Sequence, residues 1–233
     1  MKRHGRTTFE AMRSCVGTTH QLINFHHGGC TLKRRTALLL FVLLAFAVLP
    51  DGARATVGDA AETVRGFYDV LLSTMRDGPS LGAKGRYERL KPVVGRTFDL
   101  PYMARAVVGP AWANASAAEQ QEMMDAFWRY VTATYADRFE RFSGQQLQVL
   151  GEQARAANVV VDSRIVKADG KPIVIKYLMH RNGDDWRVVD VYLEGTISEL
   201  ATRRSEFASI VEHRGIDGLI AILDQKAQEF IAR

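Results

Sequence analysis

The chain has 233 residues, of which 47% are hydrophobic and 24% charged, a balance typical of a single globular domain. Its net charge of +5 arises at the N-terminus, since residues 1–55 hold eight Lys and Arg against two Asp and Glu. The remaining 178 residues hold 23 basic and 24 acidic side chains, a net charge of −1. Because this larger part has no basic stripe, the sequence argues against a nucleic-acid partner.

Residues 1–55 are predicted to be a leader that contains a signal peptide. Lys33-Arg34-Arg35 precedes an uncharged apolar run over residues 36–49, which is shorter than the roughly 20 residues of a membrane-spanning helix. Ala53-Arg54-Ala55 has the small-x-small pattern that signal peptidase requires, so cleavage is expected near Ala55. The sequence therefore predicts an exported protein in which residues 56–233 form one domain, with an uncleaved anchor as the alternative.

Cysteine and histidine usage gives no metal or disulfide framework. Cys15 and Cys30 both fall in the leader, so the exported domain would contain no cysteine. His26 and His27 lie beside Cys30 but lack a fourth partner, and a zinc site closed by protein ligands needs four. We expect neither a metal nor a cofactor.

Helices are predicted to open the domain. Apolar residues recur three and four apart over residues 57–76, which is the helical period, and Asp77-Gly78-Pro79-Ser80 would end that helix. A second, short helix is expected over 81–91, stopped by Pro92. Thr97 or Asp99 can cap a third helix, which would end at Gly109.

The longest helix is expected to begin after Ser116, where Ser116 and Glu119 form a capping box, and to extend to about Phe142. Its large apolar residues spread around more of the circumference than one core stripe needs. Such residues can line a pocket for a flexible apolar ligand or simply fill a core, and spacing leaves both open. They are Met123, Met124, Phe127, Trp128, Tyr130, Val131, Tyr135, Phe139 and Phe142.

Four strands are expected next, over residues 146–152, 158–167, 172–181 and 186–194. Asp169-Gly170 and Asn182-Gly183 are hairpin turn signals between the last three of them. Two helices, over 198–213 and 216–232, would follow, split by Gly215. Helices, then an antiparallel four-stranded meander, then helices is an α+β order.

Neither face of the predicted sheet is polar. With a turn at Asn182-Gly183, Tyr177 shares a face with Val188, while Val189 and Val191 lie on the other. A sheet that is apolar on both faces must be covered by helices on both, or curl around an apolar cavity. The residue pattern supports these two arrangements about equally.

The sequence contains no recognisable catalytic motif. His180 and His213 are the only histidines of the domain, and Asp190 is an acid within an apolar strand, for which we expect an ion pair with Arg164. The short glycine-rich stretch Gly82-Ala83-Lys84-Gly85-Arg86 does not follow a strand and is predicted to be a turn. We therefore assign no catalytic residue and expect the protein not to be an enzyme.

An ordered set of short motifs gives a family resemblance. The set resembles the MlaC-like family of periplasmic lipid-binding proteins, also called toluene-tolerance auxiliary components, over about residues 61–227. It is most similar to the hopanoid-biosynthesis-associated branch, HpnM. The motifs are Phe98-Asp99-Leu100, Met103-Ala104-Arg105, Val108-Gly109, Trp112, Gly170 to Tyr177, Trp186 to Val191, Glu194-Gly195, Arg204 to Phe207 and Gly215 to Leu219.

The chain departs from the family pattern after Gly195. The segment from Gly195 to Leu200 is one residue longer than usual, and Glu199 stands where an apolar residue is more common.

The resemblance implies a periplasmic carrier whose helices and curled sheet enclose an apolar cavity. The carrier would take a phospholipid or hopanoid between an inner-membrane ABC-type lipid transport complex and an outer-membrane partner. Periodicity and resemblance together select a cavity wall of Phe67, Leu71, Met103, Phe127, Val131, Tyr135, Tyr177, Val189, Val191 and Leu193.

Two alternative functions make different structural predictions. A non-lipid adaptor that bridges envelope proteins would have a filled core. An enzyme would need Asp190 or His180 to face an open pocket.

Overall fold

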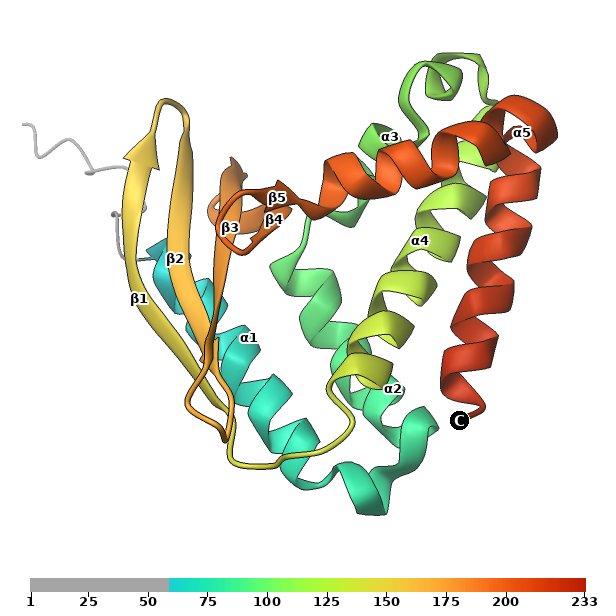
Figure 1. Ribbon diagram of the computed structural model, residues 1–233. Helices are drawn as coiled ribbons and strands as arrows, with labels where there is room; N and C mark the ends of the chain where they lie inside the picture. The colour runs from blue at the N-terminus through green and yellow to red at the C-terminus, as the bar shows by residue number, and fades with distance from the viewer. Residues whose placement is uncertain (1–58) are drawn as a thin grey trace, which may run out of the picture. The chain divides into compact units, whose positions relative to one another are not determined.

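The computed structural model describes residues 59–233, and the predicted leader lies outside them. Helices come first, then an antiparallel sheet, then a long bent helix, which confirms the α+β prediction (Figure 1). The helices are α1 (Asp59–Arg76), α2 (Gly78–Thr97), α3 (Leu100–Val108), the 3-10 helix η1 (Gly109–Asn114), α4 (Ala117–Arg138) and α5 (Glu199–Ile231). The strands are β1 (Gln146–Arg155), β2 (Asn158–Val166), β3 (Pro172–Asn182), β4 (Asp185–Leu193) and β5 (Ile197–Ser198).

The sheet has five strands in the order β1-β2-β3-β4-β5, each antiparallel to its neighbours. The prediction of four strands was wrong because it missed the short β5. In this strand Ser198 pairs with Tyr192 and Ile197 with Leu193. Two residues are too few to produce a recognisable alternation, so only the pairing reveals this strand.

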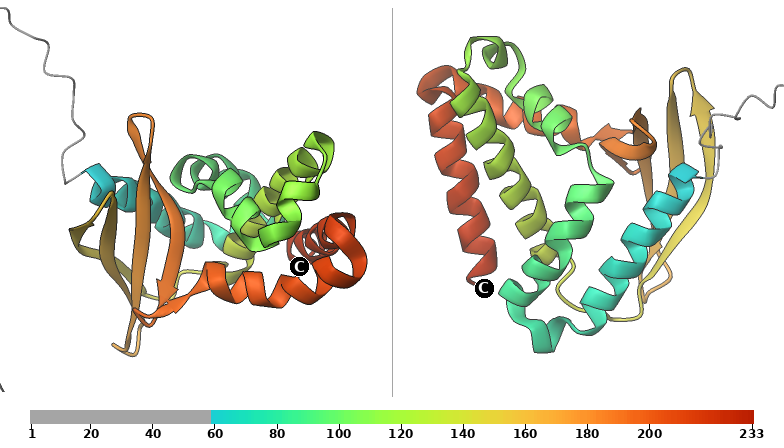
Figure 2. Two further views of the ribbon diagram at one scale, coloured as in Figure 1. Left: turned by 90° about the horizontal axis from the view of Figure 1, so that it is seen from above. Right: turned by 180° about the vertical axis from the view of Figure 1, so that it is seen from behind.

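All helices lie on one side of the sheet (Figure 2). On β2 the residues that face the helices are buried, among them Val161 and Ser163, whereas Arg164 on the opposite face is exposed. Asp162 and Lys176 pair across that opposite face with 3.3 Å between carboxylate and ammonium. The expectation that neither face is polar was therefore wrong, and so was the option of helices on both faces.

A β-bulge at Val189 corrects the predicted sharing of faces. Met179 pairs with Val188 but Leu178 pairs with Asp190, so Val189 is the extra residue of β4. Inserting one residue reverses the side-chain parity of the strand beyond it. As a result Val191 and Leu193 point to the helix side together with their β3 partners Tyr177 and Ile175, which the unbroken alternation did not predict.

The predicted helix caps at Ser116 and Asp99 are confirmed, whereas the second helix begins at Gly78 and not at residue 81. The Ser116 hydroxyl accepts from the Glu119 amide at 3.2 Å, and the Glu119 carboxylate accepts from the Ser116 amide at 2.7 Å. Asp99 caps α3 by accepting from the Tyr102 amide at 3.0 Å. The C-terminal end of α4 was predicted at about Phe142, but the helix ends at Arg138.

The helix α2 continues through Pro92, where the sequence predicted its end. Leu90, Val93 and Val94 are buried on either side of the proline, so packing of this helical face offsets the lost backbone hydrogen bond. The real interruption of α2 is at Gly82, whose φ of 62° and ψ of 178° are not helical.

The helix α5 consists of two segments separated at Gly215, as predicted. Gly215 has a φ of 69° and ψ of −173°, a backbone conformation that a residue with a side chain rarely adopts. The first segment leaves the sheet and the second returns alongside α4 (Figure 1). Arg129 on α4 and Asp224 on the second segment form a two-pronged ion pair at 2.8 and 3.0 Å.

Candidate functional site

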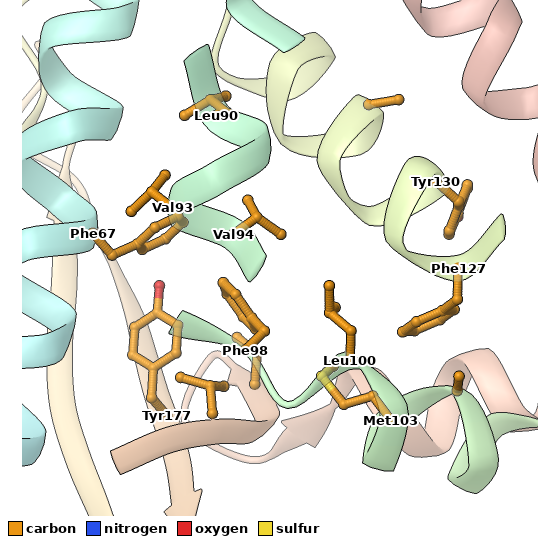
Figure 3. Packing of buried hydrophobic residues seen from close by; sticks show 14 of the residues in the cluster. Phe67, Leu90, Val93, Val94, Phe98, Leu100, Met103, Phe127, Tyr130 and Tyr177 are labelled. Carbon is orange, nitrogen blue, oxygen red and sulfur yellow. The ribbon is translucent and has the colours of Figure 1, made fainter. Parts of the chain in front are cut away.

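A pocket of about 300 Å³ lies between the helix side of the sheet, α4 and the first turns of α5. Its wall is predominantly apolar. In Figure 3, Phe127 and Tyr130 of α4 lie on one side, across from Phe98, Leu100 and Met103. The lining residues are Phe98, Met103, Phe127, Tyr130, Val131, Thr134, Tyr135, Arg138, Phe139, Ile165, Ile173, Ile175, Tyr177, Val191, Leu193, Glu199, Leu200 and Arg203.

Two aromatic rings line one side of this pocket, and a third ring packs behind them. Phe98 and Tyr135 line it with their ring centroids 5.6 Å apart. Phe67 on α1 packs edge-on behind both, at 5.4 Å from Phe98 and 5.2 Å from Tyr135. Such edge-to-face contacts are a preferred geometry of aromatic pairs, so Phe67 fixes the two rings that line the pocket.

Tyr177 forms part of the wall on the sheet side, and a short chain of hydroxyl groups supports it from behind. Its ring lies 6.0 Å from that of Tyr68, and the Tyr68 hydroxyl lies 2.8 Å from the Ser163 hydroxyl. Ser163 donates to the Ile175 carbonyl at 2.9 Å. Burial raises the pKa of both Tyr177 and Tyr135, so their hydroxyls stay protonated and add no charge to the wall.

The polar side chains of the pocket come from the second half of α4 and the start of α5: Thr134, Arg138, Glu199 and Arg203. Arg203 bonds Glu199 at 3.4 Å and Glu206 at 2.6 Å. Burial acts to lower the pKa of Arg203, but Tyr130 and the two carboxylates outweigh it and the pKa is raised. The pocket therefore combines an apolar body with a charged edge.

Comparison with known families decides what kind of protein carries this pocket. The family model described as MlaC protein matches residues 66–225, a stretch that contains every residue of the pocket wall. The chain belongs to the MlaC family. The family predicted from the motifs is confirmed, while the narrower resemblance to the HpnM branch stays a prediction.

A solved protein structure is similar to this MlaC-family chain. It is a phospholipid-binding protein from Ralstonia solanacearum in complex with a phospholipid, and it matches with a TM-score of 0.62 and 25% sequence identity. The match covers 75% of this chain and 99% of that one.

Most of the residues predicted for the wall of the MlaC-family pocket do line it. These are Met103, Phe127, Val131, Tyr135, Tyr177, Val191 and Leu193. Phe67 lies one layer behind, Leu71 is fully buried in the helical core, and Val189 is buried in the bulge, so none of these three lines the pocket.

Several lining residues were not predicted from the sequence. Ile173 and Ile175 alternate with Tyr177 along β3, and that period could have identified them. No local signal identifies Phe98, which lies between α2 and α3 and reaches the pocket because its backbone forms a parallel bridge with Val188.

Asp190 has a structural role in the MlaC-family fold. Its carboxylate accepts from the Val191 amide at 2.8 Å, the Ser198 hydroxyl at 2.6 Å and the Leu200 amide at 3.0 Å. The predicted ion pair with Arg164 was wrong: the β2 residue level with Asp190 is Val160, four positions away.

His180 has a partner that the sequence did not reveal, since its Nε2 lies 2.7 Å from the Asp99 carboxylate. Burial opposes ionisation of Asp99, but hydrogen bonds from the Tyr102 amide, His180 and Asn182 outweigh it and lower the pKa of Asp99. The enzyme hypothesis required His180 or Asp190 to face an open pocket, but neither residue lines this one. Residues 59–233 contain no group of His, Cys, Asp and Glu with the geometry of a metal site.

Proposed function

We propose that this protein binds a membrane lipid with its acyl part in the apolar pocket and carries it across the periplasm. The observation that carries the proposal is the pocket itself, an apolar wall with charged groups supplied only by α4 and α5, in a chain of the MlaC family. The phospholipid complex of the similar Ralstonia solanacearum protein supports a phospholipid as the ligand.

Burial of acyl methylenes provides the binding energy in this proposal. Each methylene removed from water contributes about 0.8 kcal/mol, so about ten buried methylenes supply roughly 8 kcal/mol. The pocket volume of about 300 Å³ equals that of about ten liquid water molecules. A carrier for a larger lipid would therefore have to separate the pocket walls.

The charged edge would hold the polar end of the lipid. Arg138 lines the pocket and is exposed to solvent, and Arg203, which also lines it, is held by Glu199 and Glu206. A phosphate group there would accept hydrogen bonds from guanidinium groups, which match its geometry better than a lysine does.

The cellular route is part of the proposal. The predicted leader would export the chain to the periplasm, where an inner-membrane ABC-type complex and an outer-membrane partner would exchange lipid with it. The near-zero net charge of the remaining 178 residues would favour release from anionic membranes. No helix within residues 59–233 is long and apolar enough to cross a bilayer.

A hopanoid is the second candidate ligand, and Glu199 favours it. This carboxylate lines the pocket at the position where the resembled family more often has an apolar residue. A carboxylate can accept a hydrogen bond from a hydroxylated polycyclic lipid, whereas it would repel a phosphate. Glu199→Leu should then shift the bound lipids from hydroxylated polycycles towards phospholipids.

The adaptor alternative expects a filled core. A pocket with the volume of about ten water molecules argues against it.

Native mass spectrometry of the protein purified from cell envelopes tests the proposal. The expected spectrum contains a protein–lipid complex, and lipid extracted from it identifies the class. Recovery of ligand-free protein alone, together with no uptake of lipid from vesicles, would refute the carrier function.

A further inference from the structure

A second, polar pocket lies where the turn between α1 and α2 meets the C-terminal end of α4. It has a volume of about 420 Å³. The start of α2 and the C-terminus of the chain lie near each other at the bottom of Figure 1. The lining residues are Gly78, Pro79, Gly82, Ala83, Arg86, Asp137, Glu140, Arg141 and Arg233.

Arg86 is the buried cation of this pocket, with only 8% of its surface exposed. Its Nε donates to the Ala136 carbonyl at 2.8 Å and its Nη1 to the Gly78 carbonyl at 3.4 Å. No carboxylate within residues 59–233 forms an ion pair with it, and its Nη2 donates to none of these residues. A guanidinium has five N–H donors, so the unused donors of a buried charge face the pocket that it lines.

The same pocket contains a helix N-terminus. Because Gly82 interrupts α2, residues 83–97 form a regular helix whose first turn begins at the pocket wall. The first amides of a helix have no partner within the helix and carry its positive end, which favours an anion there. The stretch from Gly82 to Arg86, predicted from the sequence to be a simple turn, thus supplies both the helix start and the buried cation.

The pocket is built on a close backbone contact. A Cβ on Gly78 would lie 2.0 Å from the Glu140 carbonyl oxygen, so only glycine allows the two segments to approach this closely. This contact fixes the α1–α2 turn against the end of α4, where the pocket is formed.

The side chains that line the pocket carry an excess of one positive charge. It has three arginines, Arg86, Arg141 and Arg233, and two acids, Asp137 and Glu140. Arg233 pairs with Asp137 at 3.0 Å, and Glu140 is exposed and forms no ion pair with any residue of 59–233.

We propose that this pocket binds an oxyanion of the phosphate class, with Arg86 and Arg141 as its charged donors and the first turn of the 83–97 helix as a further one. A guanidinium and a helix N-terminus are both strong phosphate donors. The phosphate can be free in solution or belong to a lipid head group. The site is separate from the apolar pocket, because Asp137 and Arg141 line one and Arg138 and Phe139 the other.

Isothermal titration with inorganic phosphate at low ionic strength tests this site on protein expressed as the full chain and purified from cell envelopes. Saturable binding is expected, weakened about tenfold in Arg86→Gln, which loses charge-assisted hydrogen bonds, and about twofold in Arg141→Gln. Arg96→Gln, which removes the same charge from an exposed position at the other end of α2, should bind as the unaltered protein does.

Absence of saturable binding, or an unchanged affinity in Arg86→Gln, would overturn the proposal. Should Arg86→Gln fail to fold, the NMR resonance of Arg86 Nε in the unaltered protein decides. Phosphate must shift this resonance, and a resonance that stays in place refutes the site.

Co-sedimentation with vesicles of phosphatidate, compared with phosphatidylcholine, distinguishes a lipid head group from free phosphate as the source of the oxyanion. Arg86-dependent binding to phosphatidate supports a lipid head group, and phosphate binding without it supports free phosphate. Lipid retained by Arg86→Gln would show that the apolar pocket works independently.

Discussion

The Asp190 carboxylate on β4 accepts a hydrogen bond from the Ser198 hydroxyl at 2.6 Å, and this contact joins the sheet to the start of α5. Ser198 in turn caps α5 by accepting from the Ala201 amide at 2.9 Å. The first turns of α5 carry Glu199, Leu200 and Arg203, all of which line the apolar pocket. The buried Asp190 therefore positions the charged edge of the pocket, although Asp190 itself does not line the pocket.

Asp190→Ala should lower the free energy of unfolding by about 3 kcal/mol, since it leaves the buried amide of Val191 and the partly buried donors of Ser198 and Leu200 without their partner. Urea unfolding at pH 7 measures the loss. Asp185→Asn is the matched control on the same strand, because that side chain is 72% exposed and its change should stay within about 0.5 kcal/mol. Equal stability of Asp190→Ala and Asp185→Asn would contradict the anchoring role.

Val131→Trp should reduce the lipid that copurifies with the protein by about tenfold. Val131 lines the pocket, and a ring that displaces two or more lipid methylenes removes at least about 1.6 kcal/mol of binding energy. Quantitative lipid extraction measures the effect, with circular dichroism to verify the fold. Gln121→Trp places the same ring on the exposed part of α4 and should leave the lipid content unchanged.

Leu193→Arg should have a similar effect through charge instead of volume, because it places a guanidinium in the apolar wall at the end of β4. The reduced lipid content should be seen by native mass spectrometry while the strand pairing is kept. Unchanged lipid content in a folded Leu193→Arg protein would mean that the lipid lies elsewhere.

Asp99→Asn should cost about 2 kcal/mol at pH 7, through weaker hydrogen bonds to the Tyr102 amide and His180. The folded pKa of Asp99 is lowered, so its stabilisation is present above the unfolded value of about 3.9 and is lost as the pH falls through the folded value. The difference between the unaltered protein and Asp99→Asn should therefore shrink below about pH 4 in urea unfolding experiments. The exposed Asp184→Asn should show no such difference.

Raised tyrosine pKa values predict a loss of stability in alkali. Burial raises the pKa of Tyr135 and Tyr177, so the folded state keeps protons that the unfolded state releases above about pH 10. Each such tyrosine should lower the free energy of unfolding by about 1.4 kcal/mol per pH unit above that value. Tyr135→Phe should make this decline shallower, whereas Tyr102→Phe, on an exposed ring, should leave it unchanged.

Local chemistry was enough to predict much of this fold. Ser116 and Asp99 start their helices as their side chains dictate, and Gly215 divides α5 because its backbone has a positive φ. The hairpins and the helical periods likewise depend on residues close in the chain. The ordered motifs were enough to identify the MlaC family.

The tertiary structure decided what depends on residues far apart in the chain. The bulge at Val189 reverses the parity of β4, and no local pattern announces an inserted residue. Phe67 does not reach the pocket because the rings of Phe98 and Tyr135 lie between it and the pocket. The strand register places Asp190 within hydrogen-bonding distance of Ser198 and away from Arg164. The sequence allows Arg86 a place in a short helix or in a turn, but its burial beside a polar pocket depends on the packing of the end of α4 against the α1–α2 turn. Periodicity assigns a residue to a face, whereas packing between distant segments decides what that face meets.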